Sequence, residues 1–216
     1  MVLEHNDFIE IEFTGKIKDG EIFDSNIPKD IEQAKLKLEA KPFIFSLGQG
    51  MFLKGIDDFL IGKEIGEYQI ELQPKDAFGE RDPKAVQIIP MKIFHQQKIN
   101  PYPGAVFNFD GKIAKIISVS GGRVMTDFNN PIAGKIVNYK INIKRKLEDQ
   151  NEKIKSFINF LFKQDFDFET KDKKLIIKTP KQFKPIVEMF KDKFKEIFNL
   201  DLEAKEIKDK PSKKKE

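Results

Sequence analysis

Cysteine and tryptophan are missing from this 216-residue sequence, and histidine occurs only twice. Without cysteine the chain can form no disulfide framework, no cysteine-based zinc site and no thiolate nucleophile, which fits a reducing compartment. The first seven residues, MVLEHND, are charged before any apolar run develops, so neither a signal peptide nor a membrane span is expected. We therefore expect a cytoplasmic protein that makes no contact with a membrane.

Phenylalanine dominates what is present. There are 21 Phe beside 3 Tyr, and hydrophobic residues make up 39% of the chain. An interior built from such rings has few hydroxyl groups to satisfy and suits a dry apolar pocket. The 39 basic and 35 acidic residues leave a formal charge of +4, which is typical of a mixed solvated surface. A nucleic-acid partner is not expected, and Lys213 to Lys215 is the only basic run that keeps this alternative open.

Four segments alternate between apolar and polar residues with the period of a half-buried strand. Their apolar positions are Ile9, Ile11 and Phe13; Phe43, Phe45 and Leu47; Tyr68, Ile70 and Leu72; and Val137, Tyr139, Ile141 and Ile143. This pattern predicts an antiparallel sheet with one buried face. Apolar residues at helical spacing over 52–60 predict one short helix, and residues 27–41, begun by Pro28 and Asp30, predict another.

Residues 83–127 have a different texture, with apolar runs at 86–94 and 105–125 and turns at Asp110-Gly111 and Gly121-Gly122. Asp-Gly between apolar strands is a strong hairpin signal. These hairpins would disrupt the first sheet, so we expect a small β-rich domain inserted into a domain made of residues 1–82 and 128–147.

After residue 147 the pattern predicts the order α-β-β-α-β. The helices are expected at 148–163 and 182–198, and the strands at 166–170, 174–179 and 200–207. The fold class is therefore α+β, with a C-terminal domain at 148–207. Residues 208–216 are charged, bury nothing and are expected to be a disordered tail.

Five segments match one family in order and at workable spacing: FIEIEFTGKIKDGEIFD at 8–24, KPFIFSLG at 41–48, FLKGIDDF at 52–59, DAFG at 76–79 and DFNNPIAG at 127–134. The chain resembles the FKBP-type peptidyl-prolyl cis/trans isomerases. It is most similar to the SlyD-like branch, and within it to the long archaeal members that carry an insert-in-flap domain and a C-terminal domain. The resemblance implies a curved antiparallel sheet wrapped on a short helix and a rotamase activity that needs no cofactor.

The resemblance also implies which residues form the site. The catalytic residues would be Phe13, Asp24, Phe78 and Tyr139, and the substrate-binding residues Phe23, Phe43, Phe52, Leu53 and Ile56. Ile56 would form the floor, and the Leu53 backbone N–H would donate to a substrate carbonyl. Asp24 would act through its charge and hydrogen bonds rather than by proton transfer. Without the family pattern, alternating aromatics indicate core, and Asp24 indicates a turn.

The sequence departs from the best-known members at three positions. Ile56 stands where small drug-binding members have Trp, and Phe78 stands where they have Tyr, so immunosuppressant binding should be weaker. Asn130 replaces the His usual in SlyD-like proteins, and the His-rich metal-binding tail of the bacterial proteins is absent. No metal site is expected. The pair Asp57-Asp58 is interpreted as a helix face.

The insertion carries more apolar side chains than a domain of its size can easily hide. The expected chaperone surface consists of Ile88, Ile89, Met91, Ile93, Phe94 and Tyr102. The partners implied are unfolded or partly folded proteins and proline-containing peptides, with a homodimer through the C-terminal domain as a further possibility. The alternative function is a non-catalytic holdase or protein-interaction module.

Overall fold

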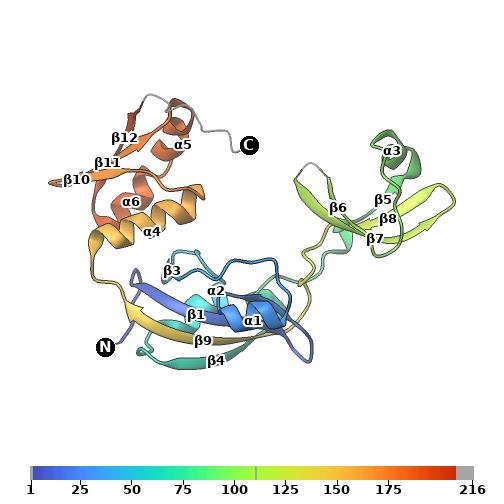
Figure 1. Ribbon diagram of the computed structural model, residues 1–216, viewed down its shortest axis with the longest axis horizontal. Helices are drawn as coiled ribbons and strands as arrows, with labels where there is room; N and C mark the ends of the chain where they lie inside the picture. Colours follow the sequence, from blue (N-terminus) through green and yellow to red (C-terminus); the bar gives the residue numbers. More distant parts are fainter. Residues whose placement is uncertain (1, 110, 208–216) are drawn as a thin grey trace.

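The computed structural model describes residues 2–109 and 111–207, and Figure 1 shows their arrangement around three separate sheets. The first sheet contains β1 (Phe8–Ile17), β2 (Ile22–Ser25), β3 (Phe43–Ser46), β4 (Glu67–Leu72) and β9 (Val137–Lys146). The strand order is β2-β1-β9-β4, and β3 also pairs with β1. Every pairing in it is antiparallel, as the alternating pattern predicts.

Alternation along β1 and β9 produces the two faces of this sheet. Ile11 and Phe13 are buried, and Ile141 and Ile143 lie opposite them on β9. Glu12 and Lys144 lie on the other face and form an ion pair of 3.3 Å between Nζ and Oε2. One face therefore builds the core, and the polar face meets water.

Two helices accompany the sheet. α2 (Lys54–Leu60) is close to the helix predicted at 52–60, and it buries Ile56 and Leu60 against the apolar face. The helix predicted at 27–41 is wrong in length, because α1 spans only Pro28–Gln33. Lys35 adopts a left-handed conformation with φ 53°, and the Leu36 N–H donates to the Ile31 carbonyl. This hydrogen-bonded reversal is a Schellman-type helix end, so the helix cannot continue.

The inserted segment forms its own four-stranded sheet. After two short 3-10 turns (Pro74–Asp76 and Pro83–Ala85) come β5 (Val86–Pro90), α3 (Met91–Gln96), β6 (Val106–Phe109), β7 (Lys112–Ser120) and β8 (Arg123–Asp127), in the spatial order β5-β8-β7-β6. The turn at Gly121-Gly122 joins β7 to β8 as predicted. Asp110 of the other predicted turn lies outside the described residues.

A separate small core holds this sheet together. It is made of Phe94, Ala105, Ile116 and Val124. The prediction that Phe94 belongs to an exposed surface is wrong, since this side chain is fully buried and packs edge-on against Phe109 at 5.4 Å between ring centroids. The chain leaves β5 at Pro90 and turns into α3, and this turns Phe94 inward.

The outgoing and returning connections of the insertion are hydrogen-bonded to each other. The Gly134 N–H donates to the Gly79 carbonyl at 2.8 Å, and the Phe128 N–H donates to the Ala85 carbonyl at 3.0 Å. Arg81 of the outgoing connection also forms an ion pair with Asp127, where the returning connection begins. We call the connecting segments 79–85 and 127–134 the paired linkers.

The C-terminal part packs helices against a three-stranded sheet. Its elements are α4 (Gln150–Phe162), β10 (Phe168–Lys171), β11 (Lys174–Thr179), a 3-10 turn (Lys181–Phe183), α5 (Lys184–Glu188), α6 (Lys191–Phe198) and β12 (Asp201–Glu206). β10 pairs with β11 antiparallel, and β11 pairs with β12 in parallel. The single helix expected at 182–198 is wrong. It is interrupted at Met189 and Phe190, and the interruption leaves Met189 exposed while Val187 and Phe194 are both buried.

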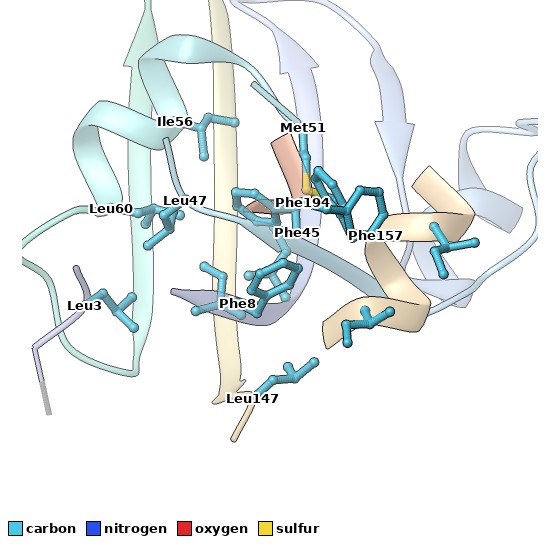
Figure 2. Packing of buried hydrophobic residues seen from close by; sticks show 14 of the residues in the cluster. Leu3, Phe8, Phe45, Leu47, Met51, Ile56, Leu60, Leu147, Phe157 and Phe194 are labelled. Carbon is cyan, nitrogen blue, oxygen red and sulfur yellow. The ribbon is translucent and has the colours of Figure 1, made fainter. Parts of the chain in front are cut away.

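One hydrophobic core joins the first sheet to the C-terminal part. Phe157 of α4 contacts Phe8 of β1 edge-on with ring centroids 6.4 Å apart, and it contacts Phe194 of α6 at 5.2 Å. Figure 2 shows these rings meeting beside Phe45 and Met51. The two parts are therefore expected to unfold together. Among the described residues, no helix is long and apolar enough to cross a membrane.

Candidate functional site

Six aromatic side chains converge on the apolar face of the first sheet. We call Phe13, Phe23, Phe43, Phe52, Phe78 and Tyr139 the aromatic cluster. Phe52 lies at its centre, with its ring centroid 5.0 Å from those of Phe13 and Phe43 and 5.6 Å from that of Tyr139. Phe23 joins Phe78 to Tyr139 through edge-on contacts at 5.5 and 5.9 Å. Tilted and edge-on pairs of this kind are the favoured geometries for aromatic rings.

The cluster has a buried base and a partly exposed side. Phe13 and Tyr139 are 5% and 1% exposed, whereas the other four rings are half-buried. Ile56 is fully buried and lies on α2, whose N-cap is the half-buried Leu53. The structure thus brings eight of the nine sequence-predicted site residues into one hydrophobic cluster, with Phe78 supplied by the loop before the insertion. The ninth, Asp24, lies close enough to Tyr139 for its charge to act on that hydroxyl.

Gly15 explains how Asp24 and Tyr139 come to face each other. Gly15 of β1 lies opposite Asp24 of β2 and opposite Tyr139 of β9, so the three residues form one row across the sheet. A side chain at Gly15 would lie 2.8 Å from Tyr139 Cζ and 3.0 Å from Phe23 Cζ. A register shift after Gly15 leaves Phe23 as an extra residue on β2, and this bulge directs its ring into the cluster.

Asp24 is the carboxylate of the site. Burial raises the pKa of its carboxyl above the ordinary value, and a hydrogen bond from the Ser25 backbone partly opposes the shift. Burial, and secondarily the charge of Asp24, raises the pKa of the Tyr139 hydroxyl well above its ordinary value. Among the described residues this hydroxyl has no hydrogen-bond partner. The site therefore combines a carboxyl group whose ionised form is disfavoured by burial with a neutral hydroxyl donor that has no partner among the described residues.

Asp24→Asn is expected to increase the free energy of unfolding near neutral pH. A raised pKa means that the folded state holds the proton more tightly than the unfolded state, so ionised Asp24 costs stability at high pH. That cost disappears as the pH falls through the folded-state pKa, and the two proteins should then converge. Denaturant unfolding of both proteins across pH checks this. Asp172→Asn, at an exposed turn, is the matched control. A variant that is less stable at neutral pH contradicts the prediction.

The Leu53 backbone offers a donor beside the rings. Its carbonyl accepts from the Ile56 and Asp57 N–H groups, at 2.9 and 3.1 Å. No described residue accepts a hydrogen bond from its own N–H, which stands at the start of α2. The family resemblance predicts that this N–H donates to a substrate carbonyl, and in the described part of the structure it is free to do so.

Sequence reasoning missed the groups that hold the site in place. The Asn26 side chain accepts from the Phe13 N–H at 2.7 Å and donates to the Ile11 and Lys41 carbonyls, at 2.8 and 3.2 Å. It therefore ties β1 to the segment that leads into β3. The one available signal was the Asn two residues after Asp24, because a short polar side chain next to a strand commonly bonds to the backbone.

Asp57 is a second missed residue: it lies on helix α2, as interpreted from the sequence, but on the buried face. It is 3% exposed, and it accepts hydrogen bonds from the Gly48 and Gly50 backbones. Burial raises the pKa of its carboxyl, and those two bonds oppose the shift. Asp58, by contrast, is exposed and paired with Lys54. Asp57 thus fixes the loop that presents Phe52 and Leu53.

The sequence-predicted surface of the insertion is only partly exposed. Ile88 and Tyr102 are about 60% exposed and Ile93 is 36% exposed, whereas Ile89 and Met91 are half-buried and Phe94 is buried. Other exposed apolar side chains lie on the same sheet: Val106, Ile113, Ile117 and Met125. Ile88 lies opposite Met125, so the exposed apolar surface continues from β5 to β8.

Comparison with known proteins relates two segments of the chain to described families. Residues 2–99 match the model of the FKBP-type peptidyl-prolyl cis-trans isomerases, and residues 87–132 match the model described as FKBP26, IF domain. The chain therefore carries an FKBP-type peptidyl-prolyl cis-trans isomerase domain and is similar to the SlyD-like proteins. Neither model extends beyond residue 132.

Three relatives illustrate the similarity. The chain is 28% identical over 147 residues to the short-type peptidyl-prolyl cis-trans isomerase of Methanocaldococcus jannaschii, covering 66% of this chain and 93% of the relative. It is 27% identical over 143 residues to a probable FKBP-type 16 kDa isomerase of Pseudomonas fluorescens, covering 64% and 87%. It is 26% identical over 139 residues to SlyD of Aeromonas hydrophila, covering 63% and 60%.

Proposed function

We propose that the protein isomerises Xaa-Pro bonds on its aromatic cluster and captures unfolded clients through the apolar surface of its insertion. The observation that carries the first part is the convergence of the six rings with Asp24 and the free Leu53 N–H. These groups come from β1, β2, β3, β9, the start of α2 and the loop that leads to the insertion. An ordinary core would have no need for a buried carboxylate or an unused donor.

The reaction explains why such a site suffices. Rotation about the Xaa-Pro bond is slow because amide resonance must be broken, at a cost of about 18 to 20 kcal/mol. No covalent bond is made or cleaved, so the catalyst only needs to bind the twisted amide better than the planar one. The planar amide is the more dipolar form, and moving it from water onto Phe rings costs it more.

Each polar group then has a role in this difference. The proline ring packs on the half-buried rings of Phe23, Phe52 and Phe78, and the Leu53 N–H donates a hydrogen bond to the neighbouring carbonyl. The Asp24 carboxylate favours the orientation in which the positive end of the amide dipole faces it. The Tyr139 hydroxyl, which faces Asp24 across Gly15, stays protonated at every physiological pH and is a donor available to the bound substrate.

Asp24→Ala and Phe78→Ala test catalysis against the holdase alternative. Each variant is expected to lower kcat/KM for an Xaa-Pro tetrapeptide by at least about tenfold, which corresponds to about 1.4 kcal/mol of transition-state stabilisation. A protease-free isomerisation assay measures this, and suppression of client aggregation is measured in parallel. A holdase would suppress aggregation in all three proteins and accelerate isomerisation in none.

The second part of the proposal is supported by the exposed apolar residues on the insertion, among them Ile88, Tyr102 and Met125. Met suits promiscuous contact because its side chain is flexible and polarisable. A client held there meets the aromatic cluster at a high effective concentration.

Deletion of residues 83–127 is expected to leave tetrapeptide isomerisation nearly unchanged and to slow proline-limited refolding of a protein at least about tenfold, because the effective concentration of the client is lost. Closing the gap with a Gly-Ser turn keeps the two halves of the first sheet together. Refolding is followed by fluorescence. Equal loss in both assays would contradict this part of the proposal.

The homodimer predicted from the sequence stays a prediction. The C-terminal part does expose apolar side chains, with Met189 80% and Ile186 45% exposed. These side chains are the surface that such a dimer would use. A cytoplasmic location likewise remains part of the proposal.

A further inference from the structure

A groove separates the outer edge of β3 from helix α4, next to the aromatic cluster. Its volume is about 570 Å³. One wall is formed by Lys41, Pro42, Phe43 and Ile44, and the other by α4 and the residues after it. Phe43 belongs both to this wall and to the aromatic cluster, where it contacts Phe13 and Phe52. The groove is therefore continuous with the site proposed to bind proline. Figure 1 shows β3 lying beneath α4.

β3 presents one unpaired backbone residue to this groove. β3 pairs only with β1 among the described strands. The Leu47 N–H donates to the Asp7 carbonyl and the Asn6 N–H donates to the Leu47 carbonyl, so Leu47 points its backbone groups towards β1. Because this direction alternates along a strand, Phe45 and Phe43 do the same, and Ile44 directs its N–H and C=O away from β1.

The neighbours of Ile44 leave this edge position open to an extended chain. The Ser46 N–H, which also points away from β1, is taken by the Met51 sulfur at 3.2 Å. Pro42 has no N–H to offer. Ile44 thus provides one donor and one acceptor side by side, which is the arrangement that pairs with a single residue of an added antiparallel strand.

The side chains of the groove favour an apolar segment with a negative charge. Ile44 and Phe160 supply half-buried apolar surface. Glu152 is neutralised by a two-bond pairing with Arg145, and Lys41 is paired with Glu39. Asp165 accepts from the Asn159 amide.

Two cations remain on the α4 side of the groove. Lys163 lies over the Phe160 ring, 4.4 Å from its centroid, and no described carboxylate forms an ion pair with it. No described carboxylate pairs with Lys155. An acidic side chain of a bound segment would find both of them.

We propose that this groove binds the part of the client chain that flanks the isomerised proline, as an extended strand paired to Ile44 and carrying an acidic residue towards Lys155. This inference rests on the proposed function, because it places the proline of the same client on the aromatic cluster. A segment of about six residues would span ~20 Å in extended form. The groove thus selects clients by the residues around the proline, and the C-terminal part contributes to substrate choice through α4.

Peptide length and charge test the proposal. Two extended peptides are made by adding six residues, one of them acidic, to either side of a short Xaa-Pro tetrapeptide. With the native protein, one of the two extensions is expected to raise kcat/KM about tenfold, which corresponds to about 1.4 kcal/mol. Ser156→Arg fills the groove from α4 and should abolish this gain while leaving kcat/KM for the unextended tetrapeptide unchanged. Asn151→Arg, on the same helix but outside the groove, should keep it. No gain from either extension, or a gain that survives Ser156→Arg, overturns the proposal.

A charge exchange and a binding assay separate the groove from catalysis. Lys155→Glu should favour a peptide with lysine at the acidic position, and Lys171→Glu, on β10, should not. Fluorescence anisotropy of a labelled ten-residue peptide should show at least tenfold weaker binding to Ser156→Arg than to the native protein. The proposal requires this difference in binding whether or not the peptide is isomerised. If the peptide binds in this way but is not isomerised, the proposed function fails and the proposed peptide-binding groove is retained. Equal binding overturns the groove. Far-UV circular dichroism of each variant verifies the fold.

Discussion

Gly15→Ala is expected to lower kcat/KM for an Xaa-Pro tetrapeptide about 100-fold, because displacing site groups by about 1 Å can cost that much. The added Cβ would lie 2.8 Å from Tyr139 Cζ and 3.0 Å from Phe23 Cζ, closer than carbon atoms approach. Tyr139 is 1% exposed and packs against Phe13, Phe23 and Phe52, so its ring cannot move without displacing a neighbouring ring. The overpacking should also cost about 1 to 3 kcal/mol of stability.

A second glycine makes the control for this variant. Gly66 also has no positive φ, and a Cβ there would approach no described atom closer than the Tyr68 hydroxyl at 3.8 Å. Gly66→Ala should therefore leave activity within about twofold, since its contacts are of ordinary van der Waals length. Peptide isomerisation and thermal unfolding of both variants provide the comparison. If Gly15→Ala were as active as Gly66→Ala, the row formed by Asp24, Gly15 and Tyr139 would have no part in catalysis.

Phe157→Ala is expected to destabilise the first sheet and the C-terminal part together by about 3 to 5 kcal/mol, the usual range for removing a buried Phe ring. The ring is 1% exposed and contacts Phe8, Phe194 and Phe198. It therefore joins β1 to α6 through α4. Hydrogen exchange resolved by segment should show faster exchange in β1 and β12 alike, and thermal unfolding should shift as a single transition.

Phe94→Ala is the matched control, because Phe94 is equally buried but belongs to the separate core of the insertion. It should accelerate exchange in β5 to β8 and leave the main transition unchanged. If Phe157→Ala affected only the C-terminal segments, the shared core would not couple the two parts, and α4 could not form a dependable wall for the groove beside β3.

Much of this architecture follows from short-range patterns. Alternation along residues 9–13 and 137–143 identifies two neighbouring strands, because one buried face is required for each. The family motifs then identify Asp24, Leu53 and Tyr139, which the structure brings together although they lie far apart in sequence. Alternation alone could not separate these aromatics from an ordinary core.

The failures arise where tertiary contacts decide. Residues 34–41 have the composition of a helix, but Leu38 is exposed and the left-handed Lys35 ends α1. Phe94 looked exposed because a continuous apolar run hides the change from β5 to α3. Asp57 looked like one half of an acidic helix face, since no local pattern shows that the backbone of Gly48 and Gly50 needs an acceptor.

The paired linkers have a consequence for which clients the protein can serve. Two backbone bonds and the Arg81 to Asp127 contact, supported by Asn129, clamp the outgoing and returning chains along their length. These contacts make the connection stiff, so the distance from the apolar surface of the insertion to the aromatic cluster is expected to be nearly constant, whichever client the proposed function brings to them. A client whose apolar segment lies too near its proline could not contact the apolar surface of the insertion and the aromatic cluster at the same time. The number of residues between the apolar segment of a client and its proline is therefore expected to decide which clients are isomerised.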